Sequence, residues 1–320
     1  MSDRAKIAER FAQVSANRNG GVILNQFRIG DCTLFSLAKI LIPIDFSERC
    51  LGATRFAIPL AERFNSEIAL LHVLLPHDDT RNPDFDGENL KDIIEARRTK
   101  AKKQLEDFLN AALHHLRVKR ALLEGDPALT IVEWAAREQP DLIMMPTHGY
   151  GPFRRLLLGS VTAKVLHDTD RPVWTGVHLA QGPPAEWGRL AHIACAVDLG
   201  SSSQRALEWA SRLAKEFKSS LSLIHVVPRL DSPGEGRYSD EYHRKITREE
   251  NIAIAQLQAR LGTHAKVALE AGEVEQTVCS TAAELHADLL VIGRGSKSAP
   301  RLLPHAYAII RESPCPVVSV

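Results

Sequence analysis

The chain of 320 residues is longer than one typical domain and fits two, because domains cluster at roughly 100 to 200 residues. Its 44% hydrophobic and 25% charged residues are typical of globular proteins and exclude collagen-like, coiled-coil and wholly disordered classes. The formal net charge is +1, and no apolar run approaches the roughly 18 to 20 residues that span a bilayer. Neither nucleic acid nor a membrane is therefore an expected partner.

The N-terminal segment, residues 1–35, mixes charged residues throughout and lacks the apolar core and cleavage pattern of a secretory signal. Ala5 to Val14 has a helical pattern, but Asn17 to Gly21 interrupts it, so a loosely ordered arm is predicted. The five cysteines form no Cys-x-x-Cys pair and are read as reduced, mostly buried side chains. These features together predict a cytoplasmic protein.

A first domain is predicted at residues 36–177, where short aliphatic runs alternate with helical patterns, as in βαβ units. The strands are nearly continuously apolar, which indicates a parallel sheet covered by helices on both faces. The predicted strands are Ala38 to Ile44, Glu67 to Leu74, Val118 to Leu123, Asp141 to Met145 and Pro172 to Val177. The predicted helices are Arg49 to Phe64, Leu90 to Leu116, Ala128 to Arg137 and Ser160 to His167. The longest of these helices is expected to bury one stripe formed by Leu90, Ile93, Ile94, Ala101, Leu105, Phe108, Leu109, Ala112 and Leu116.

A linker at residues 178–189, which contains Gly182-Pro183-Pro184, separates this domain from a second one at 190–320. The second domain repeats the first, since Asp45 and Asp198 stand 153 positions apart, as do Leu70 and Leu223. Its predicted strands are His192 to Val197, Ser220 to Val227, Ala265 to Leu269, Asp288 to Ile292 and Cys315 to Val320. The fold class is therefore α/β, with two doubly wound five-stranded parallel-sheet domains.

The loops after the first and fourth strands are the most distinctive, and such loops bind ligands in doubly wound sheets. After the fourth strand the first domain has Thr147-His148-Gly149 and, nine residues later, Gly159-Ser160-Val161 at a helix start. Glycines and a helix N-terminus together offer backbone N–H groups to phosphate oxygens.

These motifs, with Asp45 after the first strand and Leu71-His72-Val73, resemble the universal stress protein family over residues 37–320, more weakly in the second copy. The chain is identified as a tandem member, with the fold of the adenine-nucleotide α-hydrolase group. ATP-binding members carry Gly-x2-Gly-x9-Gly-Ser/Thr, which Gly149, Gly159 and Ser160 match, while Pro146 replaces the first glycine. The resemblance implies ATP, with Mg²⁺, as the ligand. Its implied contacts are Pro43, Ile44 and Asp45 with adenine and ribose, and Thr147, His148, Gly149, Gly159, Ser160 and Val161 with ribose and phosphates.

Other interpretations of these residues stay open. Asp45 and Glu48 also form a helix-start pattern, so Asp45 could cap the next helix instead of, or as well as, contacting a ligand. His148 has no evident partner base and is read as solvent-exposed rather than catalytic. The basic run Arg97 to Lys103 has acidic neighbours and no interleaved aromatics, which favours a solvated helix face over a nucleic-acid site.

The leading hypothesis is a regulatory stress protein that binds one adenine nucleotide in its first domain and acts on a protein client of unknown identity. The rivals are an interaction module that binds no nucleotide and a slow ATPase, although no dedicated catalytic motif is present. The fifth strands are expected to pair the two domains as a pseudo-dimer, and the chain could also form a homodimer. In the second domain the stretch that follows Gly293-Arg294-Gly295-Ser296, Lys297 to His305, has no Gly-Ser step, so this site is expected to be degenerate, with Asp198 serving as a helix cap beside Ser201.

Overall fold

A computed structural model describes residues 35–76, 87–147, 158–176, 189–227, 236–295 and 304–320. The side chains of 87–90, 236–243 and 304 are outside this description. Nearly all of the predicted N-terminal arm, residues 1–34, and nearly all of the predicted linker lie outside the described residues, so their extents stay predictions.

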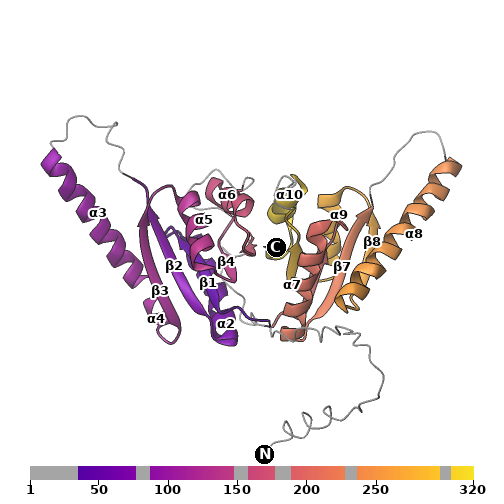
Figure 1. Cartoon of the computed structure of the whole chain (residues 1–320), viewed down its shortest axis with the longest axis horizontal. Coiled ribbons are helices and arrows are strands. Elements are labelled where there is room, and N and C mark those ends of the chain that lie inside the picture. The colour runs from indigo at the N-terminus through magenta and orange to yellow at the C-terminus, as the bar shows by residue number, and fades with distance from the viewer. Residues whose placement is uncertain (1–34, 77–86, 148–157, 177–188, 228–235, 296–303) are drawn as a thin grey trace, which may run out of the picture. The chain divides into compact units, whose positions relative to one another are not determined.

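The first half of the described chain alternates strands and helices as the sequence predicts (Figure 1). Its elements are β1 (Lys39–Ile44), α2 (Glu48–Phe64), β2 (Glu67–Leu74), α3 (Gly87–Asp107), α4 (Asn110–Leu113), β3 (Arg117–Glu124), α5 (Pro127–Glu138), β4 (Leu142–Met144), α6 (Ser160–Asp168) and β5 (Val173–Thr175). The second half repeats this order with β6 (His192–Ala196), α7 (Ser201–Phe217), β7 (Ser220–Val227), α8 (Gly236–Leu261), β8 (Lys266–Ala271), α9 (Val274–Glu284), β9 (Leu289–Ile292), α10 (Pro304–Glu312) and β10 (Val317–Ser319).

The strands form one ten-stranded sheet in the order β3-β2-β1-β4-β5-β10-β9-β6-β7-β8. All neighbouring strands are parallel except β5 and β10, which pair antiparallel with Val318 opposite Trp174. Each half is a doubly wound parallel sheet, and the two fifth strands join the halves. The predicted pairing through these strands is confirmed within the unit that extends from Phe35 to Val320.

Two hydrophobic clusters, one on each face, bury the sheet. On one face Ile40 and Ile42 of β1 pack with side chains of α2, α3, α7 and α8. On the other face Leu41, the residue between them, packs with side chains of α5, α6, α9 and α10. Successive strand residues point to opposite faces, so both must be apolar when helices cover both. This is why the strands are nearly continuous apolar runs.

The predicted helix from Leu90 to Leu116 is wrong in one respect, because the chain breaks it at Leu109. This residue has φ 46° and ψ 28°, the left-handed conformation, and separates α3 from α4. The break rotates the faces that follow it, so Leu113 is buried while Ala112, which was assigned to the stripe, is exposed. The middle of the predicted stripe is confirmed, since Ala101, Leu105 and Phe108 are buried. At its other end Ile93 and Ile94 are exposed.

Candidate functional site

The order of the strands reverses between β1 and β4, and a cavity of about 440 Å³ lies at the carboxyl ends of these strands. Open α/β sheets bind ligands in this crevice, and small-molecule sites commonly enclose about 300 to 1,000 Å³. The cavity is lined by Pro43, Ile44, Asp45, Leu71, His72, Val73, Leu75, Pro127, Ile131, Met145, Pro146, Gly159, Ser160, Val161 and Thr162.

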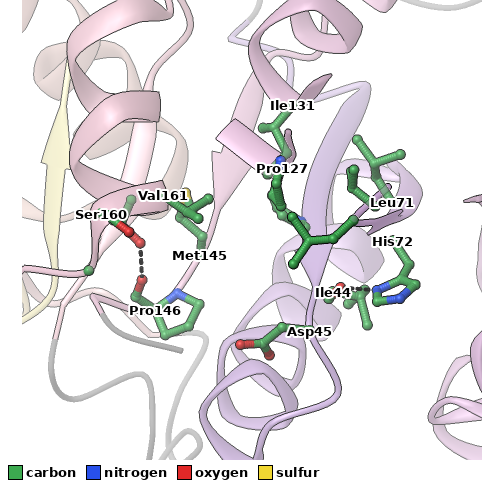
Figure 2. A pocket seen from close by; sticks show the side chains of 15 residues that line it. Ile44, Asp45, Leu71, His72, Pro127, Ile131, Met145, Pro146, Ser160 and Val161 are labelled. Carbon is green, nitrogen blue, oxygen red and sulfur yellow. Dashed lines mark hydrogen bonds between the residues drawn. The ribbon is translucent and has the colours of Figure 1, made fainter. Parts of the chain in front are cut away.

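The cavity has two walls that differ in character. Figure 2 shows Ile44, Asp45, Leu71 and His72 on one side and Met145, Pro146, Ser160 and Val161 on the other. The first wall combines aliphatic side chains with one carboxylate and one imidazole, and the second includes the start of α6. Such a site can hold a flat apolar group against the first wall and an anionic group against the second.

Asp45 follows β1 directly, and its carboxylate is fixed by the next turn. Its Oδ1 accepts a bond from the Ser47 backbone N–H at 2.9 Å and another from the Ser47 hydroxyl at 2.6 Å. The cap of α2 is Ser47, whose hydroxyl accepts from the Cys50 N–H at 3.2 Å. The prediction that Asp45 could itself cap this helix is therefore wrong. Asp45 instead holds the capping residue, and both of its bonds use the same oxygen.

The N-terminus of α6 contributes to the second wall of the cavity. Gly159 is the N-cap and supplies no side-chain cap to the first N–H groups of the helix. Its own N–H donates to the Thr147 carbonyl at 2.8 Å, and the Thr162 hydroxyl donates to the Pro146 carbonyl at 3.0 Å. These two bonds tether the helix start to the end of β4. The glycine N-cap leaves the first-turn N–H groups without a side-chain cap, and these groups and the positive end of the helix dipole both favour an anion there.

Gly159 adopts φ −61° and ψ 142°, a conformation open to any residue. The backbone therefore does not itself require glycine at this position. The absence of a side chain instead leaves room beside the N–H groups of α6 for the close approach of a ligand.

The structure brings six of the nine predicted contact residues together in the cavity lining, namely Pro43, Ile44, Asp45, Gly159, Ser160 and Val161. Thr147 is buried next to the cavity, but it is not part of the lining. The remaining two predicted residues, His148 and Gly149, lie outside the described residues.

His72 is a lining residue that is absent from the predicted contacts, although it belongs to the Leu71-His72-Val73 motif of the family resemblance. Its Nδ1 lies 2.6 Å from the Ile44 carbonyl oxygen, and its ring packs 4.5 Å from that of Phe46. Because a carbonyl oxygen only accepts, Nδ1 is the donor, and Nε2 is the acceptor of the neutral ring. The signal that could have found it is its position at the carboxyl end of β2, beside β1.

Cys50 lies beneath the site, and its Sγ donates to the Pro43 carbonyl at 3.4 Å. Burial, together with the nearby Asp45 carboxylate, raises the pKa of this thiol to about 12. The thiolate is the reactive form of cysteine, so a protonated thiol makes Cys50 a structural side chain rather than a nucleophile.

At the corresponding positions of the second domain, the side chains make different contacts. Asp198 accepts from the Ser203 hydroxyl at 2.6 Å and from the Gly200 N–H at 2.9 Å, so it supports the start of α7 through Ser203. The expectation that Asp198 itself caps this helix beside Ser201 is wrong, because the N-cap of α7 is Gly200. His225 is the counterpart of His72, and its Nε2 faces the carboxylate of Glu250 at 3.4 Å. The segment 296–303, where a Gly-Ser step was found missing, lies outside the described residues.

Among the described residues, no group of three or more His, Cys, Asp or Glu side chains could hold a metal ion. A Mg²⁺ ion bound here would depend largely on the oxygens of a ligand and on water, as is common for this ion. Within the same residues, no helix is long and apolar enough to cross a membrane.

The fold is of the doubly wound α/β class, and its cavity lies between a carboxylate turn and a helix start, at the edge where such sheets bind ligands. Comparison with known proteins identifies the family. The model of the universal stress protein family matches residues 37–175 and again 190–320, so the chain is a tandem member of this family.

Two relatives each align with less than half of the chain. A universal stress protein of Methanocaldococcus jannaschii is 33% identical over 142 residues, covering 42% of this chain and 79% of the relative. A relative from Thermus aquaticus is 31% identical over 134 residues, covering 42% of this chain and 94% of the relative.

One solved structure aligns with most of the chain. A universal stress protein from Archaeoglobus fulgidus matches with a TM-score of 0.62 and 23% identity, covering 89% of this chain and 98% of that protein. At this identity the likeness supports the fold alone.

Proposed function

We propose that this universal stress protein binds one adenine nucleotide, ATP with Mg²⁺, in the cavity of its first domain, and that occupancy regulates a stress response. The observation that carries the proposal is the cavity itself, with Asp45 on one wall and the uncapped start of α6 on the other. Gly159 and Ser160 of this wall also belong to the nucleotide pattern of the family.

In the proposed complex the base lies against Pro43 and Ile44, and Asp45 accepts from a ribose hydroxyl. The phosphates lie at the start of α6 beside Gly159, where Ser160 and Val161 present N–H groups. Thr147, His148 and Gly149 complete the proposed set of contacts. A buried site that hydrogen-bonds a hydroxyl rejects a ligand without one, so the Asp45 carboxylate favours a nucleotide over a free base.

The first test is to heat-denature the purified protein and identify any released nucleotide by mass spectrometry, followed by calorimetric titration with MgATP. Released adenine nucleotide, or titration to one site per chain, is the expected result. An empty protein that shows no binding at millimolar MgATP would overturn the proposal and favour an interaction module that binds no nucleotide.

A second test compares Asp45→Asn with Asp198→Asn, the same change at repeat-related positions. Both carboxylates accept from a serine hydroxyl at 2.6 Å, so the two changes disturb similar local structure. Asp45→Asn is expected to weaken MgATP binding about tenfold, the equivalent of ~1.4 kcal/mol, and Asp198→Asn to leave it unchanged. The reverse pattern would place the site in the second domain.

Gly159→Val is expected to abolish binding, because its side chain enters the space beside the N–H groups of α6. Gly293→Val, the same change at the glycine that follows β9 in the second domain, is unsuitable as a control. A Cβ at Gly293 would lie 2.7 Å from the Ser202 hydroxyl oxygen and 2.8 Å from the Ser202 Cβ, so this variant would strain the contact between β9 and α7.

A further inference from the structure

Arg294 follows β9 in the second domain and stands 147 positions after Thr147, the residue at the same place in the repeat. An arginine at this position would be expected near the second domain's own ligand crevice. Its side chain is instead buried, with the residue 5% exposed, and it contacts the first domain.

The guanidinium of Arg294 binds the carboxyl end of α6. Its Nη1 donates to the Leu166 carbonyl at 3.1 Å, and its Nη2 donates to the Arg171 carbonyl. Leu166 lies in the last turn of α6. In this turn the backbone carbonyls have no partner within the helix, and the helix dipole has its negative end. The planar fork of arginine can serve two carbonyls at once. Arg294 therefore anchors this helix end from the other domain.

The opposite end of the same helix contributes to the second wall of the cavity. α6 has nine residues and is about 13 Å long at ~1.5 Å per residue, so its two ends move as one short rigid rod. A second contact from the second domain supports its middle, since the Tyr307 hydroxyl donates to the Ala163 carbonyl at 3.5 Å.

We propose that Arg294 is a positioning residue through which the second domain sets the affinity of the first domain for the phosphates of its nucleotide. The inference rests on the proposed function and adds regulation to the same site. The degenerate repeat then has a role, because the loop position that would serve its own crevice supports the neighbouring one.

The expected effect is selective and partial. Loss of the guanidinium frees the carboxyl end of α6 and tilts the N–H groups at its other end, so contacts with phosphates weaken. Contacts of the base and ribose with Pro43, Ile44 and Asp45 do not involve α6. The bonds from Gly159 to Thr147 and from Thr162 to Pro146 still hold the helix start, which limits the loss.

The experiment titrates the full chain and its variants with MgATP and with adenosine, which has no phosphates. Arg294→Ala is expected to weaken MgATP binding about tenfold while adenosine binding is unchanged, a difference of ~1.4 kcal/mol. Arg294→Lys, whose single ammonium cannot serve both carbonyls well, is expected to give an intermediate loss. The matched control is Arg137→Ala, an exposed arginine in the last turn of α5, which is expected to change neither affinity.

Hydrogen exchange provides an independent readout. Without nucleotide, Arg294→Ala is expected to speed amide exchange in α6 and leave α5 unchanged.

The outcomes separate the inference from the proposed function. If the wild type binds neither ligand, the proposed function fails and the inference falls with it. If the wild type binds MgATP but Arg294→Ala keeps both affinities, or weakens both equally, the inference alone is wrong. If Arg294→Ala does not fold, the lysine variant decides, because equal losses for both ligands or no loss would overturn the inference.

Discussion

At the scale of single residues, Pro146 is the clearest departure from the nucleotide pattern. It lines the cavity beside the start of α6, and proline has no backbone N–H to offer a phosphate. Pro146→Gly restores one donor, and a bond to a charged group contributes about 1.5–3 kcal/mol. The added backbone freedom of glycine offsets roughly 0.5–1 kcal/mol of this. We expect MgATP to bind about fivefold more tightly in calorimetry, and unchanged or weaker binding in a variant of normal stability would contradict this.

The buried cysteines lead to a second prediction at this scale. Cys50, Cys195, Cys279 and Cys315 are free and buried, and burial raises the pKa of each thiol, to about 12 for Cys50 and Cys315 and about 11 for Cys279. At pH 8 these thiols stay protonated and inaccessible, and only the thiolate reacts.

A disulfide reagent that reports free thiols at pH 8 is therefore expected to modify at most one cysteine per native chain, Cys32, which lies outside the described residues. All five are expected to react in guanidinium. Rapid reaction of two or more thiols without denaturant would show that the core opens readily.

The site could be predicted from the sequence in position but not in detail. Asp45 was correctly placed after β1, because the carboxyl ends of parallel strands meet at one edge of the sheet. Which residue caps α2 was not predictable, since both Asp45 and Ser47 stand near the helix start and the backbone decides between them. Phe46, at φ 62°, turns the chain so that Ser47 reaches the Cys50 N–H. Residues such as His72 enter the site through the sheet register, which pairs this residue with Ile44.

At the scale of elements, several helices end on a residue other than glycine in the left-handed conformation. Lys218, the C-cap of α7, has φ 56° and ψ 36°, which costs a residue with a side chain about 1–2 kcal/mol. Lys218→Gly is expected to raise the free energy of unfolding by about 0.5–1 kcal/mol, after the flexibility of glycine is deducted. The control is Lys215→Gly, one turn earlier inside the helix. This change is expected to lower the free energy of unfolding by about 1 kcal/mol. Urea unfolding measures both, and equal effects of the two changes would contradict the assignment.

The strands could be predicted from the sequence more accurately than the ends of the helices. Strands were located well because helices on both faces leave a continuous apolar run that few other structures produce. The break at Leu109 was not predictable, since leucine favours helices and the usual signals of an ending, glycine or proline, are absent there. Packing of Leu109 against the core accompanies its unfavourable conformation.

At the scale of the whole molecule, the two repeats share one core. A single hydrophobic cluster includes Trp174 of β5 and Val318 of β10, together with side chains of α2 and α7. Aromatic contacts extend this seam, since the rings of Phe64 and Phe217, which occupy the same repeat position, lie 6.0 Å apart. Arg63 also stacks on Phe217 at 4.3 Å. The halves are therefore joined by side chains as well as by the antiparallel pair of strands.

This shared core predicts that the two domains unfold together. If the chain from Phe35 to Val320 melts as one unit, the calorimetric enthalpy is expected near 200 kcal/mol, at ~0.7 kcal/mol per residue, and to equal the van't Hoff enthalpy. Independent domains would instead give a van't Hoff enthalpy of roughly half the calorimetric value.

A substitution at Val318, which is fully buried opposite Trp174, tests whether the contact between β5 and β10 causes this coupling. Val318→Asp places a charge in the seam, where burial without a partner costs several kcal/mol, and is expected to separate the melting of the two halves. A wild type with two resolved transitions, or a Val318→Asp variant that still melts as one unit at the wild-type temperature, would show that the seam does not couple the domains.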